Sequence, residues 1–153
     1  MSGRKHPAHH SLVDRHNEPI IVHLIVCSKD RKHILASGSA AKAIVNAWLQ
    51  ARSWLVGRYM IMPDHIHLFC APATLPTEPL KQWVRYWKNL ASKNWPAPDQ
   101  HPIWQRDFWD TQLRREENYQ VKWEYVLNNP VRAGLVKNAD DWPFQGELNI
   151  LRW

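Results

Sequence analysis

The sequence predicts an α+β domain: a ferredoxin-like (RRM-like) split β-α-β antiparallel sheet with helices on one face and an additional C-terminal helix. Three observations lead to this fold class. Strand-like and helix-like segments follow in the order β-α-β-β-α, a Pro-Asp turn joins the second and third strands, and an extended segment follows the second helix. With 153 residues, 44% of them hydrophobic, the chain can build one core and is too short for two. We expect the second face of the sheet to be free for a ligand.

The first half of the chain contains three predicted strands and one helix. Residues 20–27 are apolar and β-branched, as in a central strand. Residues 39–53 predict a helix because alanines, an isoleucine and a tryptophan recur at helical spacing. Strands over residues 54–62 and 65–71 flank the Pro-Asp pair, so they form a hairpin.

The second half contains two helices and one extended segment. Residues 80–95 predict a helix that ends at the proline-rich stretch 96–102. Residues 104–113 are extended, and a last helix runs over 116–129 and is closed by Pro130. We see no internal repeat.

The chain divides into an arm, a domain and a tail. Residues 1–18 are a polar, flexible N-terminal arm whose histidines have no framework to hold a metal geometry. Residues 19–136 form a single domain, and residues 137–153 form a C-terminal tail. This tail is aromatic, and one hypothesis is that it folds back over the functional site and restrains it.

The net charge and the cysteines of the sequence limit the classes of function and the cellular location that we expect. Twenty Lys and Arg residues outnumber 14 Asp and Glu residues, so the net charge of +6 favours an anionic partner such as nucleic acid. Ten tryptophans add candidate platforms for unpaired bases. Cys27 and Cys70 lie in apolar runs without metal-site spacing, which indicates reduced, buried thiols. No apolar run is long enough to span a bilayer and the N-terminus has no hydrophobic signal core, so we expect a soluble, cytoplasmic protein with no membrane partner.

Two histidines one residue apart are the most informative feature of the sequence. His65 and His67 fall on a predicted strand, where alternate side chains share one face. Ile66 and Leu68 then point into the opposite layer. Two adjacent imidazoles are a ready pair of ligands for one divalent metal, and such a pair requires a third ligand.

The last helix offers candidates to complete this site. Tyr125 and Asn129 are four residues apart, so they are neighbours on one helical face and can present a phenol and a carboxamide to the same point. Tyr119 is a competitor, but it lies about 240° around a regular helix from Tyr125, and both cannot face one metal. Tyr59 alternates into a core strand and Tyr86 has no neighbouring ligand, so both are weaker candidates.

Four spaced motifs together give the sequence a resemblance to a known family. The motifs are the segment from Tyr59 to Phe69, Trp-Gln-Arg-Asp-Phe-Trp-Asp at 104–110, the run 125–136 that begins Tyr-Val-Leu-Asn-Asn-Pro-Val-Arg, and Asp-Trp-Pro-Phe at 141–144. With these motifs the sequence resembles the REP-associated tyrosine transposases of the single-tyrosine branch of the HUH endonuclease superfamily. It departs from the family at Thr111, where the family often has histidine, and at Gln145-Gly146, where the family commonly has Ser-Ser.

This resemblance implies a metal-dependent reaction on DNA. The family's metal-binding histidines fall on His65 and His67, its amide ligand on Asn129 and its nucleophile on Tyr125, with Mg²⁺ or Mn²⁺ as the metal. The implied substrate is single-stranded DNA carrying a REP-type hairpin, which is cleaved and rejoined through a 5′-phosphotyrosine intermediate. Both monomers and homodimers occur among such relatives. The general base is not visible; His23 is one candidate, although a core position is the favoured interpretation.

Basic residues outside the metal site are expected to bind DNA phosphates. Trp83 and Trp87, on the same predicted helix as three of them, are expected to pack against the sheet rather than on bases. The predicted DNA-binding residues are Lys81, Arg85, Lys88, Arg106, Arg114 and Arg115.

Two other classes of function stay open at this point. A domesticated relative could hold hairpin DNA without cutting it. A histidine-triad nucleotide hydrolase also uses alternating histidines, but it requires a third histidine where this chain has Phe69.

Overall fold

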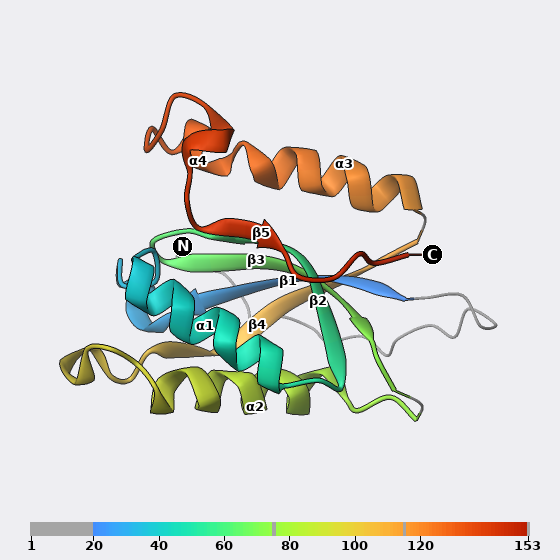
Figure 1. The fold of residues 1–153 in the computed structure, drawn as a ribbon, viewed down its shortest axis with the longest axis horizontal. Coiled ribbons are helices and arrows are strands. Elements are labelled where there is room, and N and C mark those ends of the chain that lie inside the picture. The colour runs from blue at the N-terminus through green and yellow to red at the C-terminus, as the bar shows by residue number, and fades with distance from the viewer. Residues whose placement is uncertain (1–19, 75, 115, 153) are drawn as a thin grey trace, which may run out of the picture.

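The computed structural model describes residues 20–74, 76–114 and 116–152. The predicted arm and Arg115 therefore lie outside the described residues. The strands form one antiparallel sheet in the order β4-β1-β3-β2-β5, and Figure 1 shows helices on both sides of it. The strands are β1 (Ile21–Ser28), β2 (Trp54–Ile61), β3 (His65–Pro72), β4 (Trp104–Leu113) and β5 (Gln145–Glu147), and the helices are α1 (Gly38–Gln50), α2 (Leu80–Lys93), α3 (Glu116–Leu127) and α4 (Asn129–Arg132).

The predicted α+β fold class is confirmed, and most element boundaries lie within two residues of the prediction. Helix α1 begins where the Ser37 side chain accepts a hydrogen bond from the Ala40 amide, which caps the helix. Strands β2 and β3 form the predicted hairpin, with Met60 opposite His67. The segment predicted as extended is β4, which pairs with β1 at one edge of the sheet.

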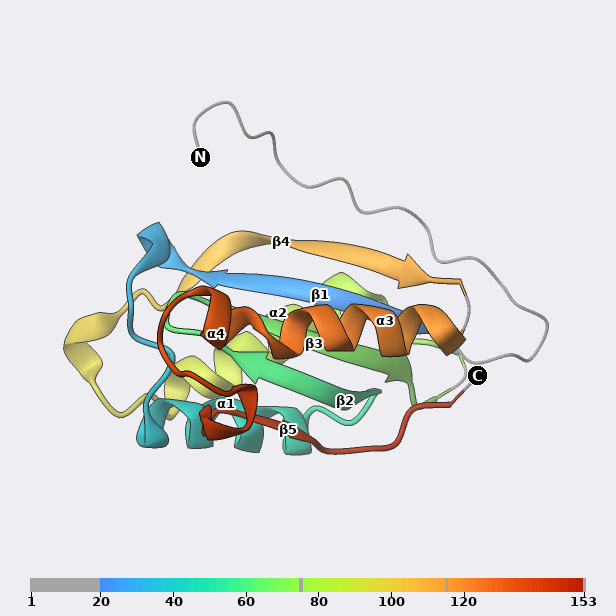
Figure 2. The same ribbon diagram turned by 90° about the horizontal axis from the view of Figure 1, so that it is seen from above.

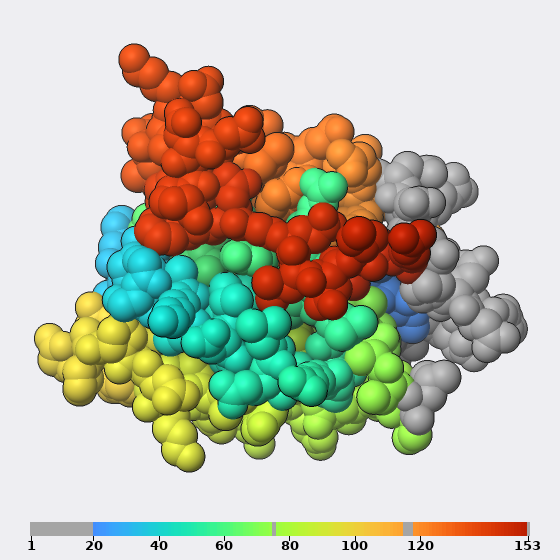
Figure 3. Space-filling view, in the orientation of Figure 1, coloured from blue at the N-terminus to red at the C-terminus, as the bar shows by residue number. Residues whose placement is uncertain are grey.

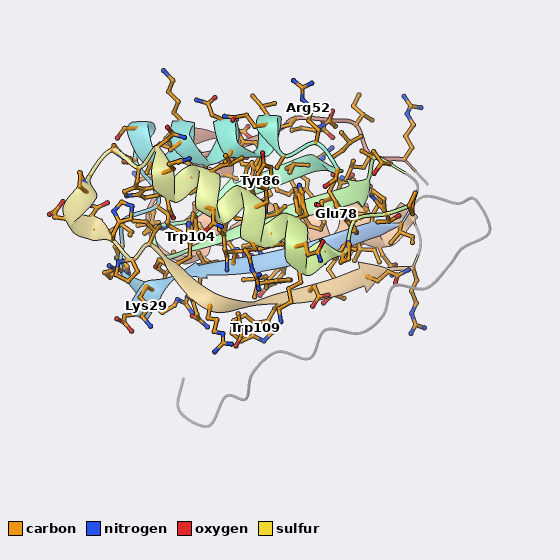
Figure 4. All side chains as sticks on the ribbon, turned by 90° about the horizontal axis from the view of Figure 1, so that it is seen from below. Lys29, Arg52, Glu78, Tyr86, Trp104 and Trp109 are labelled. Carbon is orange, nitrogen blue, oxygen red and sulfur yellow. The ribbon has the colours of Figure 1, made fainter. Side chains whose placement is uncertain are left out.

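Helices α1 and α2 cover one face of the sheet (Figures 1 and 4). Alternate residues of the central strands, such as Leu24 of β1 and Leu68 of β3, lie fully buried beneath them. Trp83 and Trp87 of α2 are also fully buried, which confirms that they pack in the core. Cys27 and Cys70 are buried free thiols, as predicted.

Helix α3 lies over the opposite face of the sheet, above β1 and β3 (Figure 2). Its apolar side buries Tyr119, Trp123 and Val126 against a second core cluster that includes Phe69 and Met60. The expectation that this face is free is therefore wrong for the part beneath α3. The additional helix was predicted, but its position over the second face follows from tertiary packing.

The C-terminal helical segment is interrupted at Asn128, between α3 and α4. The predicted helix over 116–129 was to be closed by Pro130, but α3 ends at Leu127 and Pro130 lies in the first turn of α4. Proline is tolerated there because the first turn of a helix leaves its N–H groups without intrahelical partners. Asn129 therefore begins a new short helix instead of continuing the helix of Tyr125.

The C-terminal tail runs along the edge of β2, between α3 and α1 on the surface (Figure 3). The Leu148 amide donates to the Gly57 carbonyl, and the Asn149 side chain donates to the Val56 carbonyl. Trp142 is buried and donates its indole N–H to the Ile61 carbonyl. The described part of the tail thus contacts β2 and its surroundings. Within the described ranges, no helix is long and apolar enough to cross a membrane.

Candidate active site

His65 and His67 lie side by side on β3, as their spacing predicted. Their ring centroids are 5.0 Å apart, with the ring planes nearly perpendicular. Ile66 and Leu68 point to the opposite face and are fully buried. Both histidines are on the α3 side of the sheet, where His67 is nearly buried and His65 is partly exposed.

Asp64 fixes the orientation of His65. The Nδ1 atom of His65 lies 2.7 Å from Oδ1 of Asp64, and Arg31 bridges to the other carboxylate oxygen at 2.9 Å. Partial burial acts to raise the pKa of Asp64, but the hydrogen bonds and charges of His65 and Arg31 outweigh it, so this pKa lies below its usual value. With Nδ1 engaged by the carboxylate, Nε2 is the ring nitrogen left for a metal.

His23 performs the same role for His67. Its Nε2 atom lies 3.0 Å from Nδ1 of His67 across the β1–β3 pairing, and its ring stacks on Phe69 with centroids 4.5 Å apart. Burial, together with the nearby Lys122 charge, lowers the pKa of His23 to about 4. Burial and the neighbouring His23, His65 and Arg132 lower the pKa of His67 to about 2. Both rings are therefore neutral at pH 7, the form in which imidazole binds a metal.

The structure separates the two candidate tyrosines of α3. Tyr125 has 67% of its surface exposed. Tyr119 is only 8% exposed, packs on Phe69, and its hydroxyl accepts a hydrogen bond from the Arg58 amide at 3.1 Å. Burial accordingly raises the pKa of Tyr119. Of these two phenols, the one of Tyr125 is accessible to a substrate and the one of Tyr119 is held in the core.

Arg132 joins Tyr125 to Asn129 across the break between α3 and α4. Its Nη2 atom donates to the Tyr125 carbonyl at 2.7 Å and to Oδ1 of Asn129. Its guanidinium carbon lies 4.0 Å from the centroid of the Tyr125 ring. The Arg132 charge also contributes to the lowered pKa of His67, so the arginine lies within electrostatic reach of the histidine pair. The structure thus joins Tyr125 and Asn129 through one arginine, whose charge reaches His67.

The donor set fits a divalent metal in its chemistry. Within the described ranges, there is no group of three His, Cys, Asp or Glu side chains that could hold a metal ion. Two imidazoles, each with one ring nitrogen engaged by a neighbouring side chain, and a carboxamide oxygen form a different set. Imidazole and amide oxygen together suit Mn²⁺ and, with added water, Mg²⁺. His65, His67 and Asn129 are the residues that would hold it, with Asn129 released from Arg132.

A cation-lined groove lies between α2 and β4, beside the edge of the sheet (Figure 4, near Trp104). It has a volume of about 500 Å³, and Lys81, Arg85 and Arg106 are exposed on its walls. Lys88 differs from these three because it is buried and its Nζ donates to the Gln105 carbonyl at 2.9 Å. Burial lowers the pKa of Lys88 to about 8, although Asp107 acts in the opposite direction. Arg114 is exposed outside this groove.

Sequence reasoning missed the residues that orient the site. Asp64 was seen only as part of a turn, although a carboxylate directly before a ligand histidine is a signal for an orienting partner. Arg132 was not weighed at all, although it follows Asn129 at the i, i+3 spacing that makes helical neighbours. His23 was considered as a base or a core residue, and no local pattern indicates that it lies against His67.

Comparisons with known proteins give the class of protein to which this site belongs. Residues 17–126 match the family model described as "Transposase IS200 like". The chain therefore belongs to the IS200-like transposase family.

Among particular relatives, the chain is 30% identical over 93 residues to the REP-associated tyrosine transposase of Escherichia coli (strain K12), covering 61% of this chain and 54% of that one. It is 30% identical over 95 residues to the putative REP-associated tyrosine transposase of Haemophilus influenzae (strain ATCC 51907 / DSM 11121 / KW20 / Rd), covering 55% and 53%. The chain thus spans about half the length of these curated relatives. The resemblance to REP-associated tyrosine transposases is confirmed.

Solved structures share the fold. One, described as a REP-associated tyrosine transposase bound to a REP hairpin, has a TM-score of 0.70 and 20% identity, covering 90% of this chain and 82% of that one. Another, a putative transposase from Deinococcus radiodurans R1, has a TM-score of 0.52 and 17% identity, covering 78% and 97%.

Proposed function

We propose that this protein is a metal-dependent single-stranded DNA endonuclease and strand transferase that cleaves REP-type hairpin DNA through a covalent phosphotyrosine. The observation that carries the proposal is the exposed Tyr125, joined by Arg132 to Asn129, together with the effect of the Arg132 charge on His67. A phenol nucleophile, an amide and a pair of imidazoles are groups that serve metal-assisted phosphoryl transfer to tyrosine.

Each residue has a distinct task in this reaction. His65, His67 and Asn129 hold Mg²⁺ or Mn²⁺, which when bound withdraws charge from the scissile phosphate and orients it. The Tyr125 oxygen attacks phosphorus, the bond to the 3′ oxygen breaks, and a 5′-phosphotyrosine and a free 3′-hydroxyl result. Attack by another 3′-hydroxyl reverses the step and joins strands without ATP. The phenolate is a good leaving group because the reference pKa of tyrosine is about 10.

The groove between α2 and β4 is the surface we assign to the DNA backbone remote from the cleaved bond. Lys81 and Arg85 are four residues apart on one face of α2, and Arg106 faces them from β4. We assign the same role to Arg114, which directly follows β4, and to Arg115, whereas the buried Lys88 supplies charge beneath the surface. Such contacts are sequence-independent and depend on salt.

The histidine-triad alternative finds no support in the site. The position of its third histidine holds Phe69, which is fully buried, stacks on His23 and makes a tilted ring contact with Tyr119. A phenyl ring there can neither bind a metal nor carry a phosphoryl group.

The deciding experiment traps the covalent intermediate. The full chain is incubated with end-labelled single-stranded hairpin DNA from repeats beside its own gene, with Mn²⁺ or with EDTA, and resolved on a denaturing protein gel. We expect a Mn²⁺-dependent adduct with the wild type and Tyr119→Phe, and none with Tyr125→Phe. An adduct that persists in Tyr125→Phe would overturn the assignment of the nucleophile. Tight hairpin binding without any adduct would favour a binding protein that does not cut.

A further inference from the structure

Arg132 is an exposed cation at the centre of the candidate site. The interruption between α3 and α4 at Asn128 lets the Arg132 side chain contact Asn129 and Tyr125, which precede it by three and by seven positions. Its guanidinium stacks on the ring of the proposed nucleophile and hydrogen-bonds to the amide oxygen of the proposed metal ligand. One side chain therefore touches two of the residues that the reaction needs.

Three of the five N–H groups of Arg132 are unused. A guanidinium has five N–H groups in one plane. Both hydrogen bonds of Arg132 come from Nη2, and in the part of the chain that the structure describes, Nε and Nη1 donate to no other group. Nor does any carboxylate of the described residues pair with this side chain. Both paired edges of a guanidinium include Nη2, so each free Nε or Nη1 group matches a single phosphate oxygen.

The chemistry places new charge where these free N–H groups can act. A phosphodiester has one negative charge, and attack by the Tyr125 oxygen adds a second to the phosphoryl oxygens before the bond to the 3′ oxygen breaks. The phenol proton leaves to solvent and the 3′ oxygen takes one up, so the protein itself is unchanged in charge. Donors fixed in place before the reaction are the most effective way to stabilise such developing charge.

We propose, on the basis of the proposed function, that Arg132 is a catalytic residue that binds a non-bridging oxygen of the scissile phosphate. Its Nη2 contact with Asn129 is then exchanged for the phosphate, which leaves the Asn129 amide oxygen available as a ligand. The stacking on Tyr125 keeps the guanidinium beside the attacking atom during this exchange. The competing role for Arg132 is structural, as a clamp on the junction between α3 and α4.

A substrate without the charge separates these two roles. Cleavage by the wild type and by Arg132→Ala is measured in Mn²⁺ on two hairpins that differ only at the cleaved position. One hairpin has the natural phosphate there and the other an uncharged methylphosphonate, whose two diastereomers are tested separately. Arg132→Ala should slow cleavage of the phosphate about 10²- to 10³-fold. With at least one methylphosphonate diastereomer the two proteins should differ less than about tenfold, because the charge that Arg132 neutralises is absent.

A binding measurement makes the result independent of turnover. In a Tyr125→Phe background, which keeps the ring under the guanidinium, the affinities of both hairpins are measured with and without Arg132→Ala. The arginine should favour the phosphate hairpin and be indifferent to the methylphosphonate. Lys137→Ala, which removes an exposed cation shortly after α4, is the matched control and should change neither ratio. Arg132→Met, which keeps an unbranched chain to pack on the ring, replaces the alanine variant if that variant does not fold.

The outcomes distinguish the inference from the function on which it rests. If the wild type forms the Tyr125 adduct but the loss of Arg132 slows both substrates equally and leaves both binding ratios unchanged, Arg132 is a structural clamp and the inference is wrong. If the wild type forms no adduct and binding shows no preference for the charged phosphate, the inference falls with the proposed function. Arg132→Lys should cleave the phosphate hairpin at a rate between those of the wild type and Arg132→Ala, because an ammonium only partly replaces the planar guanidinium.

Discussion

The Nε2 atom of His23 lies 3.0 Å from Nδ1 of His67, which joins strands β1 and β3 inside the candidate site. For Nε2 of His67 to bind a metal, its Nδ1 must carry the proton, and His23 is then the acceptor of that hydrogen bond. The stacking of His23 on Phe69 fixes the acceptor in place. His23 is thus placed to orient His67, the proposed metal ligand.

Removing His23 should weaken metal binding without removing a ligand. We expect His23→Ala to raise the dissociation constant for Mn²⁺ about 10- to 100-fold, as loss of such orienting partners typically does. Titration followed by electron paramagnetic resonance measures free Mn²⁺ directly. His23→Gln, whose amide oxygen can accept the same proton, should recover part of the loss, and His33→Ala, at an exposed position, should have no effect. Unchanged affinity in His23→Ala would exclude this role.

Tyr119 is expected to contribute to stability and not to cleavage. Tyr119→Phe removes the hydroxyl that accepts the Arg58 N–H, so it should lower the free energy of unfolding by about 1–3 kcal/mol in urea. The yield of covalent adduct at equal folded protein should be that of the wild type. Tyr86→Phe, at a half-exposed tyrosine of α2, is the control for loss of a hydroxyl. A loss of adduct in Tyr119→Phe at full folding would give this tyrosine a chemical role.

The groove between α2 and β4 should account for part of the salt dependence of DNA binding. The double variant Arg85→Ala/Arg106→Ala should weaken hairpin binding and reduce the slope of log K against log [salt] by about 1.5, because two phosphate contacts of about 0.7–0.9 each are lost. Lys42→Ala/Arg52→Ala removes the same charge from the exposed side of α1 and its end. Equal slopes for the two double variants would contradict a groove-specific contact. Fluorescence anisotropy at several salt concentrations provides the slopes.

Lys88 should make the protein more stable as the solution becomes alkaline. Its pKa is about 8 in the folded protein and 10.5 without burial, so between these values the unfolded chain binds the extra proton and stability rises with pH. At about 1.4 kcal/mol per pH unit this rise reaches about 3 kcal/mol. Urea unfolding of wild type and Lys88→Met at pH 7 to 10.5 isolates this effect as the difference between the proteins. Lys81→Met, at an exposed lysine of the same helix, should show the same pH dependence of the free energy of unfolding as the wild type. If Lys88→Met also shows the wild-type pH dependence, burial of Lys88 does not cause the rise.

Two glycines test how tightly the tail is packed. A Cβ at Gly57 would lie 2.6 Å from Cδ1 of Leu151 and 2.7 Å from the Tyr119 hydroxyl, whereas a Cβ at Gly38 would meet nothing within 4 Å. Gly57→Ala should therefore destabilise the fold by about 1–3 kcal/mol and displace the tail, because overpacking forces neighbours to move. Gly38→Ala, at the start of α1, should be neutral or slightly stabilising. Thermal unfolding and limited proteolysis of the tail measure both effects; equal behaviour of the two variants would mean that the tail contact is loose.

The same tail bears on the hypothesis that residues beyond Asp141 restrain cleavage. Its observed contacts are with β2 and, through Leu151, with the surroundings of Tyr119 on α3. If displacement of the tail in Gly57→Ala raises adduct yield per folded molecule, the restraint acts through α3. This remains a prediction.

Local patterns in the sequence determined the strands and helices of this protein and which of their residues share a face. The alternation of β3 put His65 and His67 on one face, and the apolar face of α2 put Trp83 and Trp87 in the core, because these patterns are local and recur every two or every three to four residues. The four motifs also placed Tyr125 and Asn129 in one short stretch of chain.

Only the tertiary structure decided which groups meet across distant strands and helices. His23 reaches His67 because β1 and β3 are neighbours in the sheet, and the sequence separation of 44 residues leaves no local sign of it. The sequence favoured Tyr125 over Tyr119 only by its spacing to Asn129, and packing of α3 on Phe69 buries Tyr119 while Tyr125 stays exposed. Arg132 contacts Tyr125 because the helix is interrupted at Asn128. The position of Pro130 predicted only the end of a helix and not this contact. Such contacts depend on how whole strands and helices pack together, so they cannot be predicted from a short segment of the sequence.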